Sequence, residues 1–124
     1  MTKSRVQPWA VAVTFILLLA SALGYVLAPA AMLGVVGTPA TPTSEFLVRT
    51  LAAAFVAMLP MLWAVRVRSG SPVERMILAG FATYMVLGSA VDLHAYLAQT
   101  VGFAAVPSII ARVALGGLLA WLAA

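Results

Sequence analysis

Four long apolar segments constrain the fold of this chain more than any other feature of its sequence. They cover approximately residues 8–28, 44–67, 73–100 and 106–123. A helix needs about 20 residues to cross a hydrocarbon core about 30 Å thick, so three segments are long enough and the fourth is short but adequate. Backbone groups in hydrocarbon must be satisfied within the segment, which favours helices. The sequence therefore predicts an all-α fold, a four-helix transmembrane bundle in a single domain spanning residues 1–124.

The composition supports a membrane location. Hydrophobic residues make up 65% of the chain and charged residues 8%, with a mean hydropathy of +1.13, whereas a soluble domain carries roughly 25% charged residues. The net charge of +4 is divided between a short tail and a short loop, so no nucleic-acid partner is expected. The chain has no cysteine and no dinucleotide, P-loop or zinc-protease motif, so we expect neither a cofactor nor a metal.

Proline, serine and glutamate residues predict where the helices begin and end. Pro8 suits the first turn of the first helix, and Pro29 follows its end. Ser71 and Glu74 have the spacing of a capping box for the third helix, with Ser71 as the N-cap. Pro60 lies inside the second helix and is expected to kink it unless neighbouring groups satisfy the carbonyl that it leaves free.

The distribution of basic residues predicts the orientation. The first and third connections contain no Lys or Arg. Five basic residues lie in the N-terminal tail or around the second connection: Lys3, Arg5, Arg66, Arg68 and Arg75. By the positive-inside rule, both termini should be cytoplasmic, in a bacterial cytoplasmic (inner) membrane. The first connection should then lie outside, and its apolar stretch at 30–36 can rest at the interface or dip inward.

The N-terminus permits a second interpretation. A basic start and an apolar run precede Ala28-Pro29-Ala30, which resembles the small-residue cleavage site of a signal peptide. The apolar run is long for a signal peptide, and a proline inside the cleavage motif is unfavourable. We therefore expect the first segment to stay in the protein as a transmembrane helix.

Three ionisable residues inside the apolar segments predict a functional site. Arg49 lies near the outer end of the second helix and Asp92 in the outer half of the third. Arg112 lies about 7–8 Å from the outer end of the fourth helix, at 1.5 Å per residue. Charges in hydrocarbon are costly, so such residues usually face one another or a wet cavity. Their similar depth predicts that they converge in the outer half of the bilayer.

Helical spacing adds further polar residues to this predicted pocket. Glu45 and Arg49 are four residues apart and can form an ion pair. Ser89, Asp92, Tyr96 and Gln99 share a face of the third helix. We predict catalytic roles for Asp92, Arg49, Arg112 and Tyr96, and ligand contacts for Tyr25, Glu45, Ser89 and Gln99.

Three functions fit these residues. The leading hypothesis is binding or conversion of a lipophilic small molecule, by isomerisation, cyclisation or epoxide opening, without a cofactor. Asp92 would transfer a proton or act as nucleophile, Arg49 and Arg112 would stabilise negative charge, and Tyr96 or Tyr25 would donate a hydrogen bond. Alternatively, the charges lock the helices together or dock a partner membrane subunit in a non-enzymatic accessory protein. A third possibility is a small dimeric, proton-coupled transporter in which Asp92 titrates. Membrane lipid is a partner in each case.

The architecture and two charged positions resemble a known group of proteins. Four spans in 124 residues, an arginine early in the second (Glu45-Phe46-Leu47-Val48-Arg49) and an aspartate late in the third (Val91-Asp92-Leu93-His94) look like the small bacterial four-helix membrane proteins of the DoxX-like group. This resemblance implies a fold more than an activity, since several of those families have no assigned function. Small multidrug transporters also have four helices, but they carry an essential glutamate in the first helix, where this chain has no carboxylate.

Overall fold

Five helices make up most of the chain in the computed structural model, which describes residues 2–67 and 70–124. They are α1 (Lys3–Leu27), α2 (Pro29–Val35), α3 (Pro42–Val67), α4 (Pro72–Leu97) and α5 (Ala105–Ala123). No strand occurs among the described residues. The helices α1, α3, α4 and α5 are each long and apolar enough to cross a membrane. The prediction of an all-α protein is confirmed, and the four long helices are candidate spans in the four predicted segments, as expected of a multi-pass membrane protein.

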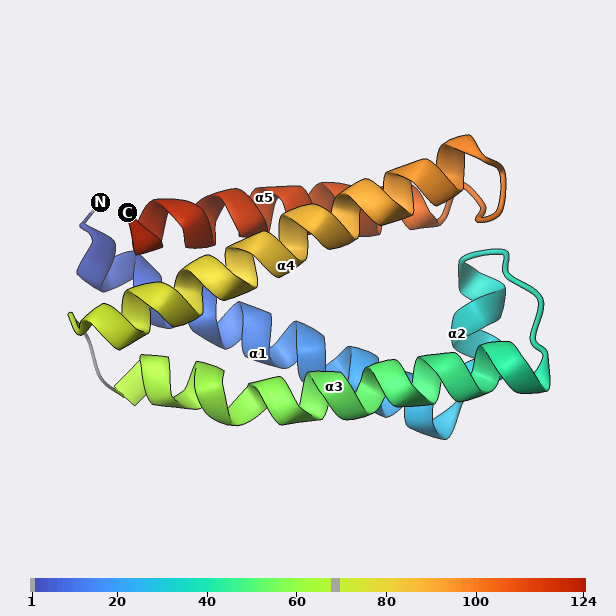
Figure 1. Ribbon diagram of the computed structural model, residues 1–124, viewed down its shortest axis with the longest axis horizontal. Helices are drawn as coiled ribbons and strands as arrows, with labels where there is room; N and C mark the ends of the chain where they lie inside the picture. The colour runs from blue at the N-terminus through green and yellow to red at the C-terminus, as the bar shows by residue number, and fades with distance from the viewer. Residues whose placement is uncertain (1, 68–69) are drawn as a thin grey trace.

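The four long helices associate as two pairs (Figure 1). Helix α1 packs along α3 and α4 packs along α5, while the contacts between the two pairs are sparser. Both termini lie at one end of the molecule, which we call the terminal end. The pairs diverge towards the opposite end, which carries α2 and which we call the α2 end. This arrangement decides which polar residues can meet.

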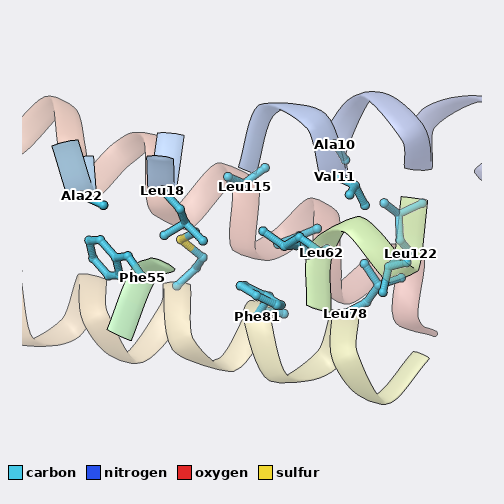
Figure 2. Close-up of a cluster of buried hydrophobic side chains, with 14 of the residues drawn as sticks. Ala10, Val11, Leu18, Ala22, Phe55, Leu62, Leu78, Phe81, Leu115 and Leu122 are labelled. Atoms are coloured by element: carbon cyan, nitrogen blue, oxygen red, sulfur yellow. The ribbon is translucent and has the colours of Figure 1, made fainter. Parts of the chain in front are cut away.

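Apolar side chains from all four long helices form a common core (Figure 2). Its members include Val11 and Leu18 of α1, Phe55 and Leu62 of α3, Leu78 and Phe81 of α4, and Leu115 and Leu122 of α5. The outer faces are also apolar, with large side chains such as Trp9, Leu87 and Ile110 mostly exposed. A soluble monomer rarely exposes such continuous apolar surface. Lipid chains would solvate it without cost, which agrees with the membrane assignment.

The two proline predictions within helices have different outcomes. Helix α1 begins at Lys3, so the prediction that Pro8 opens it is wrong: Pro8 lies inside the helix, in its second turn. Its ring nitrogen cannot donate to the carbonyl of Ser4, but that carbonyl is close to the helix start, where water or lipid headgroups can reach it. Pro60 lies inside α3, as predicted, and the helix continues through it. The kink expected at Pro60 stays a prediction.

The start of α4 follows the prediction, and its end does not. Ser71 is the N-cap, and its Oγ accepts a 3.2 Å hydrogen bond from the backbone N–H of Glu74. The helix ends at Leu97 rather than at Thr100. Gln99 adopts a left-handed backbone conformation (φ 57°), and the N–H of Thr100 donates to the carbonyl of Ala95. This Schellman-type end places Gln99 outside the helix, so its predicted position on the polar helical face is wrong.

The short helix α2 was not predicted as an element of its own. It occupies the apolar part of the first connection, where the sequence suggested only an interfacial segment. Beyond α2, Gly37 takes a left-handed conformation (φ 73°) that turns the chain towards the α4–α5 connection. There the N–H of Gly102 donates a 2.7 Å hydrogen bond to the carbonyl of Val36. This bond joins the two helix pairs across the α2 end.

Candidate functional site

An ion pair between α4 and α5 is the centre of the candidate site. Nη1 of Arg112 donates to Oδ2 of Asp92 at 2.7 Å. Asp92 lies in the last turns of α4 and Arg112 in the first turns of α5, and the antiparallel packing of these helices brings both to the same depth. The side chains are 35% and 25% exposed, respectively, so the pair is partly buried. Two of the three charges predicted to converge therefore do so.

Glycine at position 88 makes room for this ion pair. Gly88 lies one helical turn before Asp92 on α4. A Cβ atom built there would lie 3.3 Å from Nη1 of Arg112, which is closer than such atoms normally approach. The guanidinium thus lies against the surface of α4 at Gly88, and a larger residue would displace it.

Arg49 does not join the pair. Its Nη2 lies 3.9 Å from Oε2 of Glu45, one turn away on α3, as the spacing predicted. The Arg49 side chain is 54% exposed, and within residues 2–67 and 70–124 it forms no ion pair with Asp92. The physical reason is the pairing of the helices: α3 packs along α1, whereas Asp92 belongs to the α4–α5 pair.

The other predicted site residues lie in four different environments. Ser89 is buried, and its Oγ donates to the Met85 carbonyl at 2.7 Å, so its donor is already used within α4. Tyr25 packs on Phe55 with ring centroids 6.3 Å apart. Tyr96 is half-buried and follows Asp92 by one turn of α4. Gln99 is exposed beyond the end of that helix.

Arg112 lines a cavity of about 360 Å³ between the two helix pairs. Ligand sites in proteins typically occupy about 300–1,000 Å³. All four long helices contribute to the walls: Leu17, Leu18 and Ser21 from α1, Phe55 from α3, Tyr84 and Met85 from α4, and Pro107, Ser108, Ala111, Arg112 and Leu115 from α5. Asp92 is not among the lining residues. It therefore holds Arg112 from outside the cavity.

Few polar groups face this mostly apolar space. They belong to Arg112, Ser21, Ser108 and Tyr84. In the part of the chain that the structure describes, the hydroxyls of Ser21, Ser108 and Tyr84 form no hydrogen bond with protein groups. The guanidinium of Arg112 has five N–H donors, of which Asp92 accepts one. The cavity can thus offer several donors to one polar group of a ligand.

The sequence reasoning missed Tyr84 and Phe55. Their rings meet edge to face, with centroids 6.0 Å apart and planes at 82°. Tyr84 could have been found from its spacing, since Tyr84, Gly88 and Asp92 recur every four residues along α4. Phe55 gave no such signal, because one aromatic residue in an apolar segment is ordinary core composition.

No metal centre emerges from the acidic and histidine residues of the described chain. Among residues 2–67 and 70–124, no three of them lie close enough together to hold an ion. Arg112 is instead suited to an organic ligand with an anionic or hydrogen-bond-accepting group.

Comparison with known proteins identifies no family. Neither a protein-family model, nor a curated protein, nor a solved structure matches the chain. The four long apolar helices support a small four-span membrane protein, and the resemblance to the DoxX-like group stays a prediction from the sequence.

Proposed function

We propose that this membrane protein binds a lipophilic small molecule whose polar or anionic group is held by Arg112. The observation that carries this proposal is that Arg112 lines the cavity between the helix pairs while its carboxylate partner lies outside the lining. Charge-assisted hydrogen bonds from a guanidinium suit a carboxylate, phosphate or carbonyl oxygen. The apolar body of the ligand would contact Leu18, Phe55 and Leu115.

The ligand would reach the cavity from the lipid. Leu17 of α1 is 47% exposed, and Ser108 and Ala111 of α5 are exposed as well, although all three line the cavity. The mouth thus opens on the outward surface between α1 and α5, two helices that contact each other only sparingly. A molecule dissolved in the bilayer could enter there without crossing the polar connections.

A catalytic role for Asp92 receives less support from this geometry. A proton-transfer group or nucleophile must approach the reacting atom closely. Asp92 accepts a hydrogen bond from Arg112 and does not line the cavity. Arg49 and Gln99 also lie away from the cavity lining. In this proposal Asp92 orients Arg112, and conversion of the ligand by isomerisation, cyclisation or epoxide opening is the less favoured version.

The α4–α5 ion pair also favours a second candidate function, in which the charges only hold the helices together. Gly88 allows Arg112 to pack closely against α4, as a structural clamp would require. A buried ion pair can specify geometry without binding anything. This version fits an accessory membrane subunit, with no ligand in the cavity.

Native mass spectrometry and a binding titration distinguish the two functions. The wild-type protein, purified in detergent, should carry a small molecule that Arg112→Gln loses and Arg49→Gln keeps, since Arg49→Gln removes the same charge outside the cavity. A fluorescent long-chain fatty acid should bind to the wild type and about tenfold to a hundredfold more weakly to Arg112→Gln, the range expected for loss of a charge-assisted hydrogen bond.

Two further variants separate binding from folding. Asp92→Asn retains a side-chain oxygen that can accept the hydrogen bond from Arg112, so this variant should still bind the fatty acid. If Asp92 were catalytic, the same variant would lose conversion of the ligand. The double variant Arg112→Gln/Asp92→Asn leaves no unpaired charge and should fold but not bind. The binding proposal would be overturned if the wild type carries no small molecule and Arg112→Gln is merely less stable. That result would favour the second function, in which the ion pair only holds α4 and α5 together.

A further inference from the structure

Basic side chains dominate the terminal end of the molecule. Lys3, Arg5, Arg66 and Arg75 are all exposed there. Of the three acidic residues of the chain, only Glu74 lies at this end, and it is 5% exposed. The accessible charge of the terminal end is thus positive.

A second pocket of about 280 Å³ opens among these residues, away from the cavity at Arg112. Its polar wall includes Lys3, Ser4 and Gln7 from α1 and Arg75 from α4. Its apolar wall includes Leu78 of α4 and Leu122 of α5. Three helices therefore build one concave site with two cations at its rim.

Glu74 also lines this pocket, but its carboxylate is occupied by the protein itself. Gln7 Nε2 donates to Oε1, and the backbone N–H of Gly70 donates to Oε2. These bonds hold the negative charge in the wall. The two positive charges of Lys3 and Arg75 outnumber the one negative charge of Glu74, so the pocket favours an anion.

We infer that this pocket binds the phosphate group of an anionic phospholipid, with Lys3 and Arg75 as its charge partners and Ser4 as a hydrogen-bond donor. Lys3 is held at the pocket by Trp121, with Nζ 5.4 Å from the ring centroid. Trp121 and Trp9 are exposed near this end, as aromatic side chains at the headgroup level of a bilayer usually are. The pocket therefore lies at the level of the lipid headgroups, which favours the phosphate of a phospholipid over a soluble phosphate ion. This site is independent of the ligand proposed at Arg112.

Lipid titration followed by native mass spectrometry tests the inference. The detergent-purified full chain is titrated with phosphatidylglycerol, with phosphatidylcholine of the same acyl chains, and with glycerol phosphate alone. The wild type should retain phosphatidylglycerol in preference to phosphatidylcholine. Lys3→Gln and Arg75→Gln should each weaken this binding about fivefold, as expected for one basic residue near an anionic lipid.

A control that removes two positive charges outside the pocket identifies the pocket as the cause. Arg5→Gln/Arg66→Gln removes two positive charges from the same end without touching the pocket lining and should change binding less than twofold. Both pocket cations are exposed, so the single variants should keep the helical circular dichroism and thermal stability of the wild type. Equal losses in pocket and control variants, or no preference for phosphatidylglycerol in the wild type, would overturn the inference. Displacement by glycerol phosphate at the concentration of the lipid would also overturn it, in favour of a soluble phosphate ligand.

Discussion

Gln99 is the one residue other than glycine with a positive φ among residues 2–67 and 70–124. A left-handed conformation costs an ordinary L-residue roughly 1–2 kcal/mol. Here it lets the N–H groups of Gln99 and Thr100 donate to the carbonyls of Tyr96 and Ala95, which ends α4. The position therefore requires a backbone conformation that glycine adopts at no steric cost.

Replacing Gln99 with glycine should stabilise the protein. Gln99→Gly relieves the left-handed strain and should raise the free energy of unfolding by about 0.5–1 kcal/mol. Unfolding in mixed detergent micelles, followed by circular dichroism, measures this change. Gln99→Ala is the control, because it removes the same side chain but keeps the strain and should show no gain. If native mass spectrometry shows that both variants lose the small molecule carried by the wild type, that result would support the predicted contact of Gln99 with a ligand.

Close packing between α4 and α5 depends on Gly116. A Cβ atom at this position would lie 3.1 Å from Cβ of Met85 and 3.4 Å from the carbonyl oxygen of Ala82. Small residues allow transmembrane helices to approach closely, and dispersion then replaces the hydrophobic effect as the driving force. The same close approach brings Arg112 within reach of Asp92.

Gly116→Ala should weaken the α4–α5 pair. The added methyl group contacts backbone and Cβ atoms that cannot move independently, so we expect a loss of about 1–3 kcal/mol in the free energy of unfolding. Its neighbour provides a matched control: a Cβ atom at Gly117 meets nothing within 4 Å. Gly117→Ala should thus be neutral or stabilise the helix by up to about 1 kcal/mol. If both variants behave alike in the same unfolding assay, the interface is looser than described.

Viewed as one molecule, the chain has the start of α1, the end of α3, the start of α4 and the end of α5 at one end, and α2 and the α4–α5 connection at the other. Exposed basic residues gather at the terminal end. Arg68 also belongs to this part of the sequence but lies outside the described residues. The cytoplasmic location of this end, and the bacterial inner membrane itself, remain predictions from the positive-inside rule.

Cysteine labelling tests this orientation, and the absence of native cysteine makes it direct. Single substitutions at exposed positions provide the probes: Ser4→Cys at the terminal end, and Ala40→Cys and Ala104→Cys at the α2 end. In intact cells a membrane-impermeant maleimide should label the latter two, while Ser4→Cys should react only after the membrane is permeabilised. The reverse pattern would show that the basic end lies outside.

Local patterns in the sequence were sufficient to predict the four long helices and the contacts within one helix. The four spans follow from apolar length, since each helix satisfies its own backbone groups in hydrocarbon. The Ser71 cap and the Glu45–Arg49 pair follow from spacing along one helix, and the structure contains both. The helix ends were less predictable, because Gln99 gives no sign in the sequence that it adopts a left-handed conformation.

Contacts between helices could not be read from the same patterns. Arg49 and Arg112 each lie inside an apolar segment at similar predicted depth, yet only Arg112 contacts Asp92. That choice depends on which helices pair, and pairing depends on side-chain packing such as that around Gly116 rather than on apolar length. The same packing places Tyr84 and Phe55 in the cavity wall, whereas Asp92 contacts Arg112 from outside the cavity. Hydropathy is a property of single segments, whereas the site arises where α1, α3, α4 and α5 meet.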